Sequence, residues 1–218
     1  EYIKASQVSG VKNESVSQFM GNMYLEYNIY DNYMMFFNKH FVSPSATFGL
    51  GFYKYYLIDS MDVNGEFCYQ IMFKPKRKQE LTFSGEIFVA KDGWAIKKYD
   101  MQMVKVNLNY VNDMTLRQEF VRVDSVYWMP LLDEMVVDFN VINNTKEVTG
   151  FYAHKTSSYQ NFVINQPKEK SFYRTPANIY TDDQSFFRSE NYWDSIRHME
   201  LADEEKIVYN MVDTISNL

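Results

Sequence analysis

The run Lys74-Pro75-Lys76-Arg77-Lys78 places four positive charges within five residues. Lysine and arginine side chains at this density could bind an anion such as a phosphate or a carboxylate. The run also lies between two apolar stretches, where a charged segment containing proline is typical of the connection in a β-hairpin. Two interpretations therefore stay open for Lys74, Lys76, Arg77 and Lys78: a solvated turn, or a contact with anionic lipid or an acidic partner surface.

The side chains that could catalyse a reaction or bind a metal are dispersed along the sequence. The three histidines, His40, His154 and His198, do not have the spacing of metal ligands, and the single cysteine, Cys68, lies in an apolar stretch. The sequence contains no phosphate-binding glycine loop, no GxSxG motif and no HExxH motif. It therefore predicts a protein that is not an enzyme and that holds no metal or cofactor.

The composition indicates a globular domain that does not bind nucleic acid. Of the 218 residues, 46% are hydrophobic and 17% are aromatic, and aromatic residues are favoured in strands. The formal net charge is -6, whereas binding to nucleic acid depends on positive charge that neutralises phosphates. The sequence opens at Glu1 without a methionine, and we therefore expect a segment of a longer precursor.

The elements that would position these side chains are strands, because from Phe52 onwards apolar residues recur at every second position. Asp92-Gly93 and Asp124-Ser125 indicate tight turns between consecutive strands. The short connections leave no room for helical crossovers, which disfavours a parallel sheet. The sequence therefore predicts a mainly β fold of the α+β class, a curved antiparallel β-meander with a few helices.

We interpret the chain as a single domain with four regions. They are a mixed N-terminal region (1–51), the antiparallel meander (52–165), a loop-rich region (166–202) and a C-terminal helix (203–216). In the first region we expect a short helix at 14–20 and strand structure within 23–42. The meander should end with two short strands near 148–154 and 159–164. Asp203 is a suitable N-cap for the last helix, whose apolar residues form one stripe.

The many aromatic residues allow two interpretations. The rings can fill the core of a curved sheet, or a strongly bent sheet can leave a concave apolar cavity that holds an acyl chain. The residues that we expect to line such a cavity are Phe83, Ile87, Trp94, Trp128 and Phe139. Periodicity alone does not separate the two interpretations.

Short stretches along nearly the whole chain resemble a domain of unknown function found in Bacteroidetes-type outer-membrane proteins. They are Asn28–Asn32, Phe41–Pro44, Phe52–Leu57, Phe73–Arg77, Phe83–Ile87, Trp94–Ile96, Gln118–Phe120, Arg197, Ala202–Lys206 and Tyr209. In that family the domain stands between a carboxypeptidase-regulatory-like β-sandwich and a membrane β-barrel. The family usually has leucine after its Ser-Pro pair, and this sequence has Ser45 there.

The central meander is also similar to the half-barrel of periplasmic lipoprotein carriers, in which a bent sheet shelters acyl chains. The resemblance implies a half-barrel-like fold on the periplasmic side of the bacterial outer membrane. Its partners would be the flanking domains of the same precursor, including the membrane barrel, and no catalytic residue is implied. We therefore expect a non-enzymatic structural or adaptor domain. The alternative is binding of a lipid, or of lipoprotein acyl chains, on the concave face.

Two serines match a modification signal of the same bacterial group. Asp59-Ser60-Met61 and Asp124-Ser125-Val126 resemble the Asp-Ser/Thr-apolar signal for O-glycosylation. Both serines fall near expected strand ends, where a glycan could project into solvent. Ser60 and Ser125 are therefore candidate O-glycosylation sites.

Overall fold

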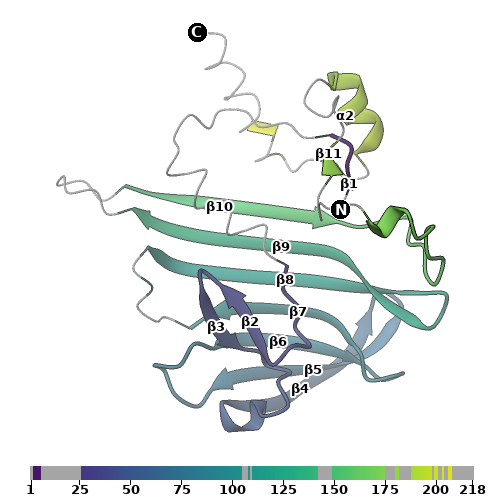
Figure 1. Ribbon diagram of the computed structural model, residues 1–218. Coiled ribbons are helices and arrows are strands. Elements are labelled where there is room, and N and C mark those ends of the chain that lie inside the picture. Colours follow the sequence, from purple (N-terminus) through teal and green to yellow (C-terminus); the bar gives the residue numbers. More distant parts are fainter. Residues whose placement is uncertain are drawn as a thin grey trace. The chain divides into compact units, whose positions relative to one another are not determined.

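In the computed structural model, the strands of the described residues form one large sheet and two small ones (Figure 1). The structure describes residues 2–5, 26–104, 108, 110–141, 149–174, 180–181, 188–197, 199–200, 203 and 206–207. The chain divides into two compact units, one formed by Glu1–Ser17 with Val163–Leu218 and the other by Gln18–Phe162. The second unit contains the large sheet and is called the sheet unit below.

The large sheet has seven antiparallel strands in the spatial order β10-β9-β8-β7-β6-β5-β4. Their bounds are β4 (Tyr53–Val63), β5 (Glu66–Pro75), β6 (Phe83–Ala90), β7 (Ile96–Met103), β8 (Val111–Val123), β9 (Tyr127–Val141) and β10 (Thr149–Ser158). Each strand pairs with the one before it, so the predicted mainly β fold with an antiparallel meander is confirmed. The sheet is open, and β4 and β10 are its two edges.

The turns of the meander lie where the sequence predicts them. Gly93 has φ +82° between β6 and β7, and Asp124 and Ser125 have φ +50° and +60° between β8 and β9. These left-handed conformations are the ones that tight hairpin turns require. The basic run ends β5 and forms the connection from β5 to β6.

The expectation of a second short strand at 159–164 is wrong. β10 is one continuous strand, and the Tyr159 N–H donates to the Leu131 carbonyl (3.0 Å) just past its end. Asn161 then has φ +56°. A left-handed residue turns an extended chain away from its partner strand, so the pairing stops there.

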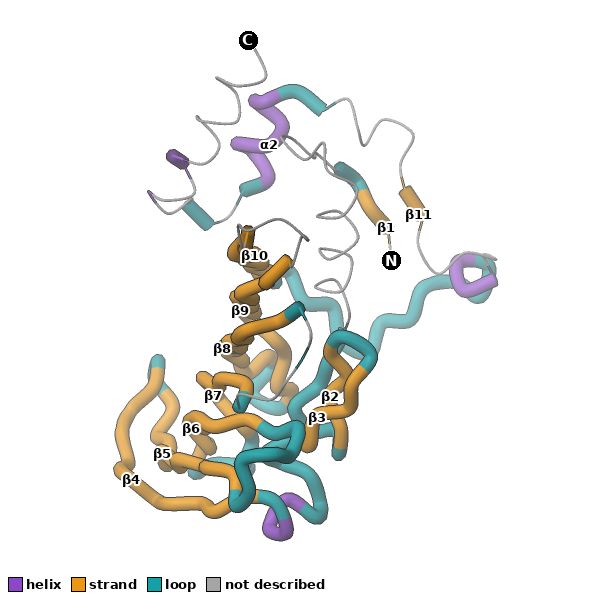
Figure 2. The backbone as a smooth tube through the Cα atoms, turned by 90° about the vertical axis from the view of Figure 1, so that its left-hand side faces the viewer, coloured by secondary structure: helices purple, strands orange, loops and turns teal. Residues whose placement is uncertain are grey.

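A short hairpin lies against one face of the large sheet (Figure 2). It consists of β2 (Tyr33–Phe36) and β3 (Lys39–Val42), so the strand structure expected within 23–42 is present in its second half. The Val42 N–H donates to the Leu81 carbonyl (2.9 Å), and the Tyr53 hydroxyl donates to the Val42 carbonyl (2.5 Å). We call the face under this hairpin the inner face of the sheet, and the opposite face the outer face.

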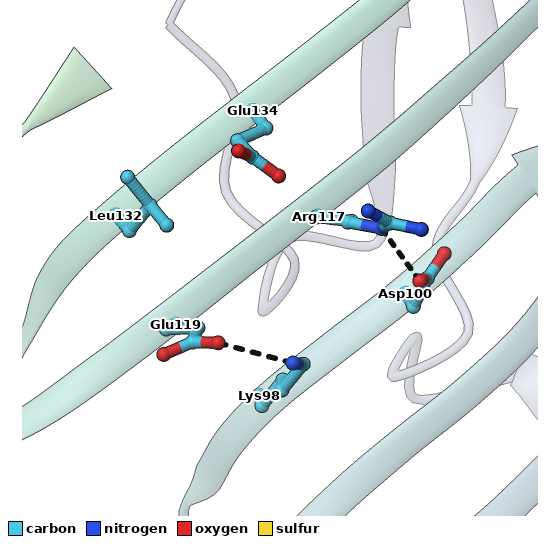
Figure 3. A pocket seen from close by; sticks show the side chains of 6 residues that line it. All are labelled: Lys98, Asp100, Arg117, Glu119, Leu132 and Glu134. Atoms are coloured by element: carbon cyan, nitrogen blue, oxygen red, sulfur yellow. Dashed lines mark hydrogen bonds and ion pairs between the residues drawn. The ribbon is translucent and has the colours of Figure 1, made fainter. Parts of the chain in front are cut away.

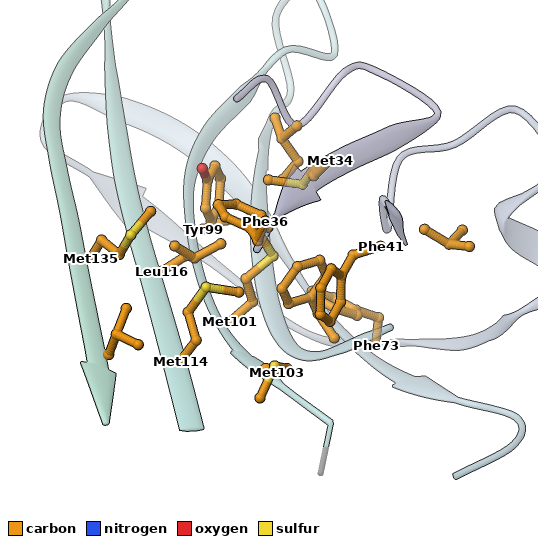
Figure 4. Packing of buried hydrophobic residues seen from close by; sticks show 14 of the residues in the cluster. Met34, Phe36, Phe41, Phe73, Tyr99, Met101, Met103, Met114, Leu116 and Met135 are labelled. Carbon is orange, nitrogen blue, oxygen red and sulfur yellow. The ribbon is translucent and has the colours of Figure 1, made fainter. Parts of the chain in front are cut away.

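The core of the sheet unit lies between the hairpin and the inner face (Figure 4). Phe83 is 0% exposed, and its ring centre lies 5.2 Å from that of Phe41 and 6.2 Å from that of Phe36. Full burial of a large apolar side chain stabilises a fold by about 1.5–3 kcal/mol. The hairpin is therefore part of the core of this unit.

The other unit contains short elements. β1 (Tyr2–Ile3) pairs in parallel with β11 (Tyr180–Thr181), and the helical segments are η3 (Phe172–Arg174) and α2 (Glu190–Ile196). A further 3-10 segment, η2 (Gly49–Gly51), belongs to the sheet unit.

The two helices expected near the ends of the chain fall largely on residues that are not described. Asp203, Lys206 and Ile207 are helical, while the rest of the helix expected at 203–216 and the whole of that expected at 14–20 lie outside the described residues. In the described part of the chain, no helix has the length and apolar character needed to cross a membrane.

Candidate functional site

The five residues expected to line an apolar cavity lie in three environments. Phe83, Ile87 and Phe139 are buried in the core, Trp128 is partly buried and packs against that core, and Trp94 is 69% exposed. Among the described residues, Phe83 contacts Phe36 and Phe41 of the hairpin, and Phe139 contacts Phe37 in the turn of the hairpin. At these positions the inner face is therefore covered by aromatic side chains.

Trp94 lies in the turn between β6 and β7 and has φ +56°. A bulky residue in this left-handed conformation costs about 1–3 kcal/mol of strain. The indole stacks on the Tyr69 ring, with ring centres 5.8 Å apart and 11° between the planes, and Phe67 contacts Tyr69 edge-on at 5.9 Å. Lys91 Nζ is 5.7 Å from the centre of the Phe67 ring. We call Phe67, Tyr69 and Trp94 the aromatic tip.

The edge strand β4 continues this apolar surface. Leu57 and Ile58 are exposed, and Ser60 lies directly opposite Tyr69 in the β4–β5 ladder. The register shifts between Leu57 and Asp59, so Ile58 is the extra residue of a β-bulge. A bulge twists an edge strand and disfavours uncontrolled pairing with other chains. The aromatic tip and the bulged part of β4 thus form one accessible surface that can make apolar contacts.

The basic run forms a turn whose cations have different surroundings. Arg77 pairs with Glu80 (2.6 Å between Nη1 and Oε1), and Lys76 Nζ donates to the Leu50 carbonyl (2.6 Å). Lys74 is exposed at the end of β5, and Lys78 is exposed in the turn. All four cations are therefore exposed, and two of them, Lys76 and Arg77, also support the turn through these contacts.

A polar hollow of about 330 Å³ lies on the outer face, across β7, β8 and β9 (Figure 3). Lys98 Nζ is 3.0 Å from Glu119 Oε1, and Arg117 Nε is 2.7 Å from Asp100 Oδ2. Glu134 lies opposite Arg117 on the next strand. Partly exposed ion pairs of this kind contribute about 0–1 kcal/mol each. The charges of the hollow largely neutralise one another, which suits a solvated sheet face better than a reaction centre.

A buried polar group on the inner face was not identified from the sequence. Asp133 is 3% exposed, accepts a hydrogen bond from the Tyr27 hydroxyl and lies 3.4 Å from Lys155 Nζ. Tyr99, fully buried beside it, donates to Gln118 Oε1 (3.0 Å). Burial, together with the nearby Asp133 carboxylate, raises the pKa of both Tyr27 and Tyr99. The sequence contains a signal for this burial. Because side chains alternate along a strand, Asp133 falls on the same face of β9 as Met135.

Trp128 has cationic neighbours. The guanidinium carbon of Arg122 is 5.0 Å from the centre of the Trp128 ring, and Nζ of the buried Lys97 is 5.9 Å from it. Arg122 also pairs with Glu66 (2.9 Å) and Asp92 (2.6 Å). These contacts join the ends of the β4–β5, β6–β7 and β8–β9 hairpins. Trp128 therefore helps to hold the hairpin ends together.

The remaining candidate residues lie on several strands and in one turn. Ser60 is exposed within β4, and Ser125 is exposed in the turn between β8 and β9. Cys68 is buried, and burial raises the pKa of its thiol. His154 Nε2 lies 3.3 Å from the Thr156 hydroxyl. In the described part of the chain, no three His, Cys, Asp or Glu side chains are arranged to hold a metal ion.

The described residues of the sheet unit define an open antiparallel β protein with an exposed aromatic tip. Residues 1–160 match the model of a family of unknown function, DUF5686. Because this match covers well over half of the 218 residues, the chain belongs to that family. A search of curated proteins and a search of solved structures found no match.

Proposed function

We propose that the chain is a non-enzymatic adaptor domain that binds neighbouring domains or proteins through the aromatic tip and the bulged part of β4. The observation that carries the proposal is Trp94, which combines backbone strain with an indole that is 69% exposed. Neither property stabilises the fold, because strain opposes folding and an exposed ring gains little from burial. Strained and exposed residues of this kind are concentrated at functional surfaces.

The chemistry of the surface supports a protein partner. Tryptophan and tyrosine are enriched among the residues that dominate binding energy, and Trp94 and Tyr69 supply one of each. Leu57 and Ile58 add aliphatic area beside them. Lys91 and Asp62 place charges at the margin, which matches the polar rim around the apolar centre of protein interfaces.

The proposed location is the periplasmic side of a bacterial outer membrane, and the proposed architecture is a half-barrel similar to lipoprotein carriers. The location is supported by the short stretches that resemble outer-membrane proteins. The curvature is supported by register shifts in three strand pairs, which fall at Leu57/Asp59, Phe88/Val89, Val111/Asp113 and Glu119/Phe120. Shifts of this kind bend strands. The proposed partners are the flanking domains of the same precursor, including a membrane barrel.

Site-specific photo-crosslinking in the intact precursor, in living cells, tests this proposal. A photoreactive residue at Trp94 should form a crosslink to a protein segment that mass spectrometry can identify. The matched control is Tyr152, an aromatic residue of the opposite edge strand that is 78% exposed. Equal yields at the two positions, or crosslinks from Trp94 to lipid alone, would contradict an adaptor role for the aromatic tip.

Binding of a lipid or of lipoprotein acyl chains is the second candidate function, and the methionines of the core favour it. Met101, Met103, Met114 and Met135 project from the inner face, and none is more than 3% exposed (Figure 4). Methionine is flexible and repacks around irregular apolar shapes. An acyl chain could therefore occupy this face if the β2–β3 hairpin moved away from it.

Variants that shrink the hairpin rings test this second function. Phe36→Ala with Phe41→Ala would open apolar space beside the methionines, so acyl-chain uptake measured by native mass spectrometry should rise. Met35→Ala, on an exposed position of β2, is the control and should leave uptake at the wild-type level. Absence of bound acyl chains in both variants, with circular dichroism showing folded protein, would refute the candidate.

A further inference from the structure

We propose that Lys54 and Lys74 form a binding site for the phosphate group of an anionic lipid headgroup. The two residues, called the lysine pair below, are directly opposite each other in the antiparallel β4–β5 ladder, and both are exposed. They lie at the opposite end of this ladder from Phe67 of the aromatic tip. The site is therefore separate from the aromatic tip.

Electrostatic repulsion between the two lysines favours a bound anion. Side chains directly opposite in an antiparallel pair have Cβ atoms about 4.5–5.5 Å apart, and like charges there repel. Within the described residues no carboxylate pairs with Lys54 or Lys74, although the nearby Arg77 pairs with Glu80. Lys78, exposed in the adjoining turn, adds a third positive charge. A bound anion would remove this repulsion.

The rest of the sheet shows how unusual the lysine pair is. Where two acids are opposite, as with Glu86 and Asp100, each has a donor: Gln70 Nε2 donates to Glu86 (2.7 Å), and Arg117 Nε donates to Asp100 (2.7 Å). The lysine pair has no corresponding acceptor among the described residues. A phosphate oxygen can accept from two ammonium groups at once and would supply it.

The neighbouring side chains favour a lipid as the source of the phosphate. Tyr56 lies opposite Met72 in the same ladder, two positions from Lys54 and Lys74 respectively, and therefore on the same face of the sheet as the lysine pair. Tyr56 is 46% exposed. Tyrosine is enriched where a membrane meets water, because its ring is apolar and its hydroxyl is polar. A phosphate on the lysine pair would place the rest of a lipid headgroup next to this apolar pair, so a lipid fits the site better than free phosphate.

Vesicle binding by the 218-residue chain tests the inference. The chain should bind vesicles that contain phosphatidylglycerol more tightly than vesicles of phosphatidylcholine alone, and added salt should weaken the binding. Each lysine near an anionic surface contributes about fivefold in affinity, so Lys54→Gln with Lys74→Gln should lower the affinity by about 25-fold. The control is Lys39→Gln with Lys170→Gln, which changes the net charge equally at two other exposed positions.

Three results would overturn the inference. The first is an equal loss of vesicle binding in both double variants, because net charge alone would then explain it. The second is absence of binding to phosphatidylglycerol vesicles by the unmodified chain. The third is binding of inorganic phosphate, followed by NMR shifts at Lys54 and Lys74, as tight as binding to the vesicles, because free phosphate would then be the ligand.

A second variant tests the electrostatic premise without any ligand. Lys54→Glu replaces the repulsion with a cross-strand attraction to Lys74, so the melting temperature at low salt should rise and the gain should shrink as salt is added. The same variant should lose vesicle binding at least as strongly as Lys54→Gln does. An unchanged or lower melting temperature would show that the lysine pair does not repel, and the inference would lose its basis.

Discussion

Two groups of aromatic side chains in the sheet unit make similar ring contacts but differ in their exposure to solvent. Under the β2–β3 hairpin, Phe83 contacts Phe36 and Phe41 and is 0% exposed. At the aromatic tip, Trp94 contacts Tyr69 at a similar ring separation, yet it is 69% exposed and has a strained backbone. The first group removes apolar area from water and stabilises the fold. The second keeps apolar area in water, where a partner can cover it.

The number of aromatic residues in a group does not decide the role of that group. Ring contacts contribute about 0.5–1.5 kcal/mol beyond burial in either place. The difference lies in the burial term, which is large in the core and small at the tip. Substitutions in the two groups should therefore separate stability from binding.

Among the substitutions, Phe83→Ala should have the largest effect, a loss of about 3–5 kcal/mol in the free energy of unfolding, because it leaves a cavity where the hairpin rings meet the sheet. Urea denaturation followed by circular dichroism measures this loss. Phe67→Ala, at the half-exposed ring of the aromatic tip, is the matched control and should cost much less. A loss below about 1 kcal/mol for Phe83→Ala would mean that the hairpin does not pack on the sheet.

Gly85→Ala should rank second, with a loss of about 1–3 kcal/mol. A Cβ atom at Gly85 would lie 2.2 Å from the Asp100 carbonyl oxygen and 2.7 Å from the Met101 Cα, so β6 and β7 would have to shift. Gly51→Ala is the control, because a Cβ there meets no heavy atom within 4 Å. Thermal melting of both variants measures the difference, and equal melting temperatures would contradict this account of β6–β7 packing.

Alkaline pH should weaken the core group. Burial raises the pKa of Tyr27, Tyr53 and Tyr99 above the ordinary value of 10.0. The unfolded chain then loses these protons above pH 10 while the folded chain keeps them, so this part of the stability is fully present below pH 10. It falls by about 1.4 kcal/mol per pH unit for each tyrosine as pH rises further.

Urea unfolding at several pH values between 8 and 11.5 measures that fall. In the Tyr53→Phe variant, the free energy of unfolding should decrease less steeply with pH, by the contribution of one tyrosine. At pH 8 the hydroxyl is protonated in both the folded and the unfolded state, so there the variant reports only the loss of hydrogen bonds. A stability that does not change between pH 10 and pH 11.5 would show that these hydroxyls are accessible to water.

Trp94→Gly should have the smallest effect on stability, within about 0.5 kcal/mol, because relief of strain at φ +56° offsets the lost stacking on Tyr69. Urea denaturation checks this value. A photoreactive residue at Leu57, beside the aromatic tip, should at the same time lose its crosslinks to the partner. A loss of more than about 2 kcal/mol would instead assign Trp94 a role like that of Phe83.

The strands and turns of the meander were accessible from the sequence because their causes are local. Alternation along β9 identifies which of its residues face the core, and Asp124-Ser125 marks the turn before it. The end of β10 was missed because it depends on the left-handed conformation of Asn161, a residue type that adopts both signs of φ. In the candidate site, the hairpin connection formed by the basic run was predicted, but the position of Lys54 opposite Lys74 was not.

The amino-acid sequence dictates the period-two pattern, the hairpin turns and hence an antiparallel sheet, because each follows from the conformational preferences of neighbouring residues. Which aromatic rings are covered depends instead on how the chain packs in three dimensions. Phe83 is buried by a hairpin about 40 residues earlier in the chain, a long-range contact that periodicity does not encode. Tyr27 reaches Asp133 across 106 positions, and Lys54 faces Lys74 through strand register. Such contacts depend on how the strands and the hairpin assemble in space. They determine which residues form the core and which lie on the proposed binding surfaces.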